Sequence, residues 1–135
     1  MVGKFFWKGV IFVWFLSLCS IFPAVAQEGS WQGSDKGPQL KAQLTDKEKN
    51  ASRRIAVVDV DVRNVTLTDP ISYRGGGSEF GHLEYRLDGG PFILPMANRL
   101  IFEGLTPGKH TIEVSLADGS FRPLGAKASL EVVIP

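Results

Sequence analysis

The chain has 135 residues, a formal net charge of +1 and a single cysteine, Cys19. This near-neutral charge gives no electrostatic reason to bind nucleic acid or an anionic membrane surface. One cysteine excludes an intrachain disulfide framework and a thiolate metal cluster.

Residues 1–26 have the pattern of a secretory signal peptide. Lys4 and Lys8 form a basic start, residues 9–22 are mostly apolar, and residues 23–26 (PAVA) end in the small-x-small pattern of a cleavage site. The apolar run is shorter than the roughly 20 residues of a spanning helix, and an uncleaved anchor is the alternative. Cleavage would remove Cys19 and leave 13 basic against 14 acidic side chains, a net charge of −1. The remainder is long enough for one domain with a modest core.

After the cleavage site, residues 27–37 are polar and glycine-rich, which predicts a flexible leader. Trp31 stands out in this leader, and we expect it to pack back onto the domain. In residues 38–44 apolar and polar side chains alternate, which predicts an edge strand. We expect residues 45–51 to form a charged turn. The sequence predicts no helix there or later, because no segment shows the apolar stripe of a helix.

The next element is a long strand in residues 53–65, where three valines alternate with charged side chains. Residues 66–80 form a long connection with three consecutive glycines. Four more strands follow at 81–87, 99–102, 109–116 and 127–134, separated by turns rich in glycine, proline and aspartate. The pattern predicts an all-β domain over residues 38–135, a β-sandwich of six or seven strands with an immunoglobulin or fibronectin type III-like architecture.

Residues 105–110 (LTPGKH) resemble the corner before strand F of fibronectin type III and related sandwiches. There, leucine, proline and glycine lead into an aromatic residue that hydrogen bonds back to the corner. Leu105, Pro107 and Gly108 match this pattern, and His110 stands near the place of the usual tyrosine. We expect these four residues to have a structural role, with the imidazole of His110 as the group that would make the bond.

A longer resemblance covers roughly residues 58–135. Residues 81–91 (GHLEYRLDGGP) and 104–118 (GLTPGKHTIEVSLAD) are similar to small exported bacterial domains of uncharacterised function with the pattern GHxxYxLDG…LxPGxHxIxVxLAD. Some of these relatives have two or three histidines after the first glycine, whereas this chain has only His82. The resemblance implies an immunoglobulin-like fold and export, and it implies no activity.

The two histidines belong to neighbouring antiparallel strands in this prediction. Each begins its own strand, so we expect them at opposite ends of the sheet, too far apart to share a metal ion. His110 is in phase with Ile112 and Val114 and should be buried at the corner. His82 is out of phase with Leu83 and Tyr85 and should face solvent.

Other chemical motifs are weak. Asp59 and Asp61 share one face of a strand, where they could bind calcium, but such carboxylates are more often solvated and paired with basic side chains. The glycines at 75–77 are followed by no helix and no Lys-Ser/Thr, so they do not form a phosphate-binding loop. No serine or histidine has an evident catalytic partner. We therefore expect no enzyme and no cofactor.

One group of residues is brought together by the predicted topology. In a sandwich, the connections 66–80 and 117–126 emerge at the same end, as the binding loops of antibody domains do. Aromatic and arginine side chains are common interface anchors, although the aromatic residues could instead close the end of the core. The predicted binding residues are Tyr73, Arg74, Phe80, His82, Asp118, Phe121 and Arg122.

Two functions follow as expectations. The first is an exported, non-enzymatic binding module, periplasmic or secreted, whose partner is an envelope protein or a glycan. The alternative is a periplasmic protein that handles copper or zinc through His82, Asp118 and Glu79. We expect no nucleic-acid partner and no membrane span once the signal is cleaved.

Overall fold

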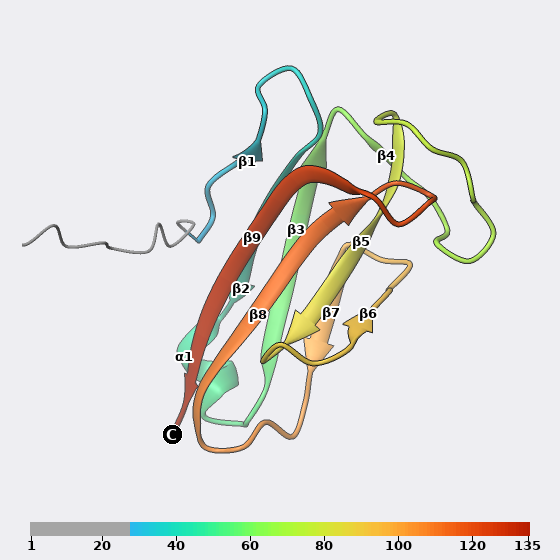
Figure 1. Ribbon diagram of the computed structural model, residues 1–135. Coiled ribbons are helices and arrows are strands. Elements are labelled where there is room, and N and C mark those ends of the chain that lie inside the picture. The colour runs from blue at the N-terminus through green and yellow to red at the C-terminus, as the bar shows by residue number, and fades with distance from the viewer. Residues whose placement is uncertain (1–27) are drawn as a thin grey trace, which may run out of the picture.

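The computed structural model describes residues 28–135, and the predicted signal peptide at 1–26 lies outside the described residues (Figure 1). The described chain has nine strands and one short helix. In chain order they are β1 (Gln32–Gly33), β2 (Gln39–Thr45), α1 (Lys47–Ala51), β3 (Ala56–Arg63), β4 (Thr66–Leu67), β5 (Phe80–Leu87), β6 (Phe92–Ile93), β7 (Arg99–Phe102), β8 (Gly108–Ala117) and β9 (Pro123–Ile134).

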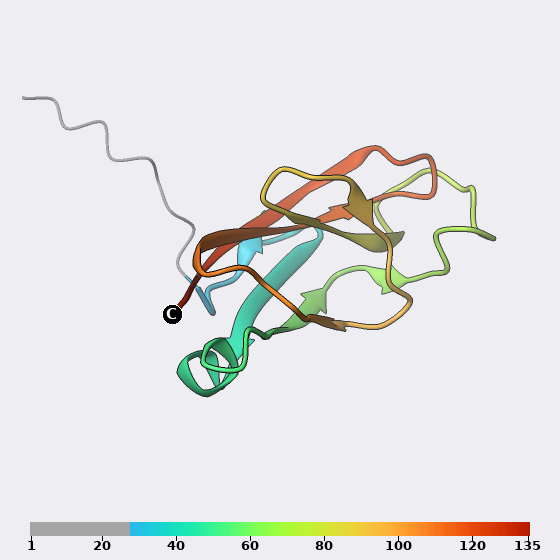
Figure 2. The ribbon, with the colours of Figure 1, turned by 90° about the horizontal axis from the view of Figure 1, so that it is seen from below.

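The strands form two sheets, one on each side of the core (Figure 2). The first sheet has the order β1-β2-β3-β7 and is antiparallel throughout. The second has the order β4-β5-β8-β9, with β6 added to β5. Only β4 pairs in parallel there, and the long β8–β9 pair runs from the Gly108↔Ile134 rung to the Ala117↔Pro123 rung.

The core lies between the two sheets and follows from the alternation within the strands. From the first sheet, Leu40, Val58 and Val60 are buried, and their strand neighbours face outward. Tyr85 and Ile112 are fully buried on the second sheet. Burying these side chains removes apolar surface from water. Each Å² of buried apolar surface stabilises the folded state by about 25 cal/mol, and this is the main term that stabilises such a domain.

The structure confirms the all-β sandwich and all six strands expected from the sequence. Three further strands, β1, β4 and β6, have only two residues each. The expected turn at 45–51 instead contains the helix α1, so the prediction of no helix was wrong. This helix is a single turn with one buried residue, Ala51, so it has no apolar stripe to detect.

The range predicted as a flexible leader contains β1, which pairs with β2. Ahead of β1, the backbone N–H of Gly29 donates to the carbonyl of Ala42 at 2.9 Å. The guanidinium of Arg63 lies 3.7 Å from the centre of the Trp31 ring, so Trp31 packs on the domain as expected. Residues 29–33 are therefore tied to the first sheet.

The corner before β8 is closed by His110, as the resemblance to fibronectin type III suggested. Its Nε2 donates to the carbonyl of Thr106 at 2.7 Å, and its Nδ1 lies 2.6 Å from Oδ2 of Asp88. Leu105 is buried, and its N–H donates to the backbone carbonyl of Arg54 at 3.0 Å. Gly108 has a φ of 121°, which suits glycine, and Pro107 precedes it.

Within the described residues, no helix has the length and apolar character needed to cross a membrane.

Candidate functional site

The connection 68–79 and the turn 118–122 meet at one end of the sandwich, and we call them together the loop end (Figure 1). A Cβ placed on Gly119 would lie 2.4 Å from the carbonyl oxygen of Gly75 and 2.7 Å from Tyr73. The two segments therefore touch through backbone at this glycine, where any side chain would separate them. The structure thus brings together the two connections that the topology predicted.

Asp118 organises the turn from inside. Its side chain is buried, and Oδ1 accepts hydrogen bonds from the N–H groups of Ser120 at 2.8 Å and Arg122 at 3.0 Å. The Nε of Arg122 donates to Oδ2 at 3.2 Å. The backbone N–H of Arg122 is the main reason why the pKa of Asp118 is lowered. Backbone N–H groups of its own turn and of Gly77 in the connection 68–79 hold this buried carboxylate as an anion.

His82 is buried, with 2% of its surface exposed, so the prediction that it faces solvent was wrong. It does project from the outer face of its sheet, but the turn 118–122 folds over that face. The Phe121 ring covers the imidazole edge-on at a centroid distance of 4.9 Å. Its Nε2 lies 3.3 Å from Oε1 of Glu84, and its Nδ1 is buried with no hydrogen-bond partner in the part of the chain that the structure describes. Strand periodicity alone cannot predict a loop that covers the outer face.

The other predicted residues form the rim of the loop end. Phe80 and Phe121 are 39% and 43% exposed, so each ring both covers the end of the sandwich and presents a surface. Tyr73 packs on Phe80 at a centroid distance of 5.5 Å, and the guanidinium of Arg74 lies 5.7 Å from the Phe121 ring. The side chain of Arg122 is 71% exposed. Aromatic rings and arginine side chains are therefore both exposed at the loop end.

The loop connection is shaped by Asp69, which the sequence did not single out. Its Oδ1 accepts from the N–H of Ile71 at 2.8 Å, and its Oδ2 accepts from the hydroxyl of Ser72 at 2.5 Å. The bond from Ser72 is the largest cause of the lowered pKa of Asp69. Such an Asx turn fixes the start of the connection and leaves Ile71 projecting outward, 72% exposed.

The three residues of the metal alternative are not arranged as a ligand set. Within residues 28–135, no group of three or more His, Cys, Asp or Glu side chains is placed to hold a metal ion. Glu79 is exposed, and the carboxylate of Asp118 is used by its own turn. Asp59 is paired with Arg99 at 2.5 Å and Asp61 with Lys41 at 3.8 Å, as expected for solvated strand carboxylates.

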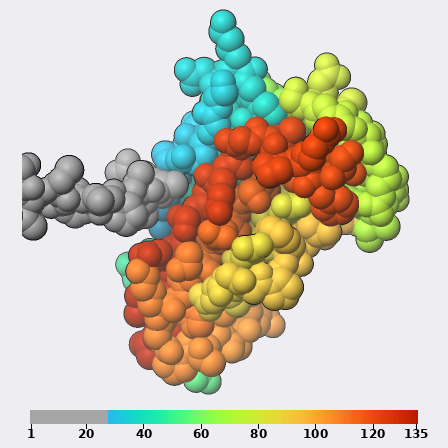
Figure 3. All heavy atoms as spheres, in the orientation of Figure 1, coloured from blue at the N-terminus to red at the C-terminus, as the bar shows by residue number. Residues whose placement is uncertain are grey.

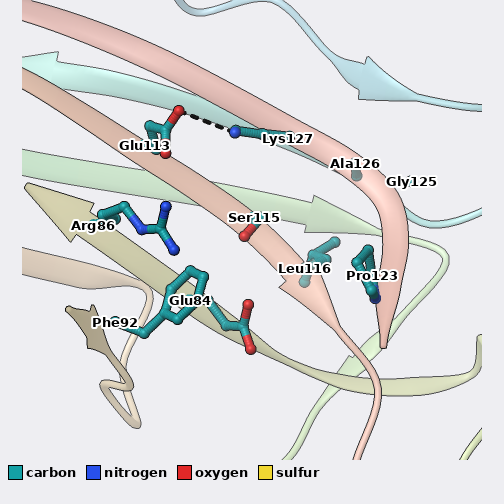
Figure 4. A pocket seen from close by; sticks show the side chains of 10 residues that line it. All are labelled: Glu84, Arg86, Phe92, Glu113, Ser115, Leu116, Pro123, Gly125, Ala126 and Lys127. Carbon is teal, nitrogen blue, oxygen red and sulfur yellow. Dashed lines mark ion pairs between the residues drawn. The ribbon is translucent and has the colours of Figure 1, made fainter. Parts of the chain in front are cut away.

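A groove that sequence reasoning missed lies on the outer face of β5, β8 and β9. It has a volume of about 320 Å³ and runs from β6 at one side to the start of β9 at the other (Figure 4). In the space-filling view, the segment around β6 (yellow) and the first part of β9 (red) border this face (Figure 3). Its principal lining residues are Glu84, Arg86, Phe92, Glu113, Ser115 and Lys127.

The groove forms because β9 bends away from β8. The rungs Ser115↔Lys127 and Ala117↔Pro123 leave three residues of β9 opposite the single residue Leu116. Such a bulge increases the local twist and curves the sheet. Gly125, at the bend, has a φ of 81°, a left-handed conformation that favours glycine. Alternating charges along β5, β8 and β9 were visible in the sequence, but nothing there indicated the bend that hollows the surface.

Comparison with family models, curated proteins and solved structures finds no match for this chain. The resemblance of residues 58–135 to small exported domains stays a prediction.

Proposed function

We propose that this chain is an exported, non-enzymatic binding module whose partner contacts the loop end. The observation that carries the proposal is the exposed rim of Arg74, Phe80, Phe121 and Arg122 on a buried support. Aromatic and arginine side chains are the residue types that most often anchor interfaces.

The residues beneath the rim hold the turn 118–122 in one conformation, which favours specific binding of a partner. Asp118 fixes the turn through two backbone N–H groups, and Gly119 seats it directly against Gly75. Side chains held in this way lose little additional entropy when a partner binds. The rim is therefore preorganised for contact.

The partner is an envelope protein or a glycan, and the chemistry of the rim favours a protein. Ile71, in the connection 68–79 of the same loop end, adds an aliphatic side chain that is 72% exposed. Exposed aliphatic and aromatic groups next to arginines suit a protein surface with an apolar centre and acidic edges. The signal-peptide pattern of residues 1–26 supports a periplasmic or secreted location for this encounter.

Site-specific photo-crosslinking in the exporting cells tests the proposal. A photoreactive phenylalanine analogue replaces Ile71 in the full chain, and the matched control carries the same analogue at Val133. Val133 is also well exposed, but it lies on β9 opposite Lys109, at the other end of the β8–β9 pair.

We expect one discrete adduct from position 71 and none of that size from position 133. Adding Arg74→Ala and Arg122→Ala should remove the adduct without lowering the amount of folded protein. An identical adduct from both positions, or one that survives loss of both arginines, would contradict the proposal.

A further inference from the structure

The groove on the outer face has a balanced set of charges. Along β5, Glu84 and Arg86 both point into it, and Arg86 stands directly opposite Glu113 on β8. From β9, Lys127 reaches across to Glu113 at 3.0 Å (Figure 4). Two carboxylates and two cations therefore face one space, so a strongly anionic or cationic ligand would meet a like charge wherever it lay.

One donor in this groove lacks a partner. The Nε of Arg86 is buried, and it makes no hydrogen bond within the described residues. Buried polar groups are nearly always hydrogen bonded in folded proteins, because an unsatisfied donor costs about 1–3 kcal/mol in protein variants. This atom has almost no surface open to solvent, so an oxygen acceptor from outside the chain would satisfy it after a small shift of the side chains around it.

An aromatic ring closes the β6 side of the groove. Phe92 pairs with Arg86 across the β5–β6 ladder, and the guanidinium lies 4.2 Å from its ring centre. The ring is 53% exposed. It therefore offers an apolar surface beside donors and acceptors, and Pro123 adds a second apolar wall on the β9 side.

We propose that this groove binds a neutral saccharide. A sugar hydroxyl donates and accepts at once, so it can bridge a carboxylate and a neighbouring guanidinium or ammonium group. The C–H face of a sugar ring is apolar and can lie on Phe92. The volume of about 320 Å³ is at the lower end of small-molecule sites, which suits one or two sugar rings in an open groove. This site is separate from the proposed partner surface at the loop end.

Two-dimensional NMR of residues 27–135 tests this assignment with cellotetraose, maltotetraose and chitotetraose as neutral probes and oligogalacturonate as the anionic probe. At least one neutral probe should shift the backbone amides of Arg86, Ser115 and Lys127. Phe92→Ala should weaken that binding about tenfold, because the apolar platform is lost. Arg86→Met, which keeps the apolar stem but removes the donor, should weaken it by a similar factor.

The chain contains a matched control for the charged groups. Lys127–Glu113 lines the groove, whereas Lys109–Glu131 is a similar ion pair at the far end of the same two strands. Lys127→Met should weaken saccharide binding, and Lys109→Met should leave it unchanged. Arg74→Ala, at the loop end, should also leave it unchanged, which separates this site from the proposed function. No shift of groove amides with any neutral probe, or tighter binding of the anionic one, would overturn the assignment.

Discussion

The two histidines lie at opposite ends of the β5–β8 pair, and the two ends are closed in different ways. At the corner end, both ring nitrogens of His110 have close partners, Asp88 Oδ2 at 2.6 Å and the Thr106 carbonyl at 2.7 Å. At the loop end, His82 has one long hydrogen bond, to Glu84 at 3.3 Å, and its Nδ1 has no hydrogen-bond partner among residues 28–135. One end is closed by a histidine's own hydrogen bonds, the other by a loop laid over a histidine. Of the two ends, the loop end is the one with a rim of exposed aromatic and arginine side chains.

The strongest test of this contrast compares the two alanine variants. His110→Ala removes two hydrogen bonds, at least one of them to a charged group, and should lower the free energy of unfolding by about 2 kcal/mol. His82→Ala removes a ring contact and one long hydrogen bond, and should cost about 1 kcal/mol, because Phe121 can settle into the space. Urea unfolding of both variants measures the difference. Equal costs would mean that His82 supports the fold as strongly as the corner does.

The corner was predictable from the sequence because its signal is local. Leu105, Pro107 and Gly108 occupy fixed offsets before His110, and the same strand phase that buries Ile112 buries the histidine. His82 was misassigned because its neighbour Phe121 is 39 residues further along the chain. Alternation within one strand says which face a side chain occupies, and it cannot say whether another segment covers that face.

The same limit explains which of the other features could be predicted from the sequence. The loop end could be predicted because sandwich topology places its two connections at one end. The groove could not, since it depends on how β9 pairs with β8 around Leu116. The two-residue strands β1, β4 and β6 are too short to show a period, and α1 is one turn with no apolar stripe.

A second test asks whether the loop end can be loosened without loosening the His110 corner. Gly119→Ala places a methyl group 2.4 Å from the carbonyl oxygen of Gly75, and the backbone there cannot yield without moving the connection. We expect a cost of about 1 kcal/mol in unfolding free energy, typical of overpacking. Amide exchange should speed up in residues 68–79 and stay unchanged at the His110 corner.

Gly37→Ala is the matched control, because its new Cβ would meet only Ser34, at 3.5 Å or more. Protection of residues 68–79 should be unaffected in that variant. Faster exchange over the whole chain in Gly119→Ala would instead show that the two ends unfold together.

The smallest expected effect is a pH dependence that belongs to the corner alone. The hydrogen bond to Asp88 is the largest cause of the raised pKa of His110, and the N–H of Thr111 is the largest cause of the lowered pKa of Asp88. A raised histidine pKa in the folded state adds stability that is complete below the unfolded pKa of about 6.5 and is lost as pH rises through the folded pKa. The lowered pKa of Asp88 adds stability that is lost as pH falls below about 3.9 and through the folded pKa.

His110→Gln isolates this contribution, since glutamine can donate one hydrogen bond at the corner but does not titrate. The stability advantage of the unsubstituted chain over His110→Gln should be larger at about pH 6 than at about pH 9, measured by urea unfolding. An advantage that does not change with pH would mean that His110 closes the corner as a neutral ring. The contrast with His82 would then rest on the number of hydrogen bonds and not on charge.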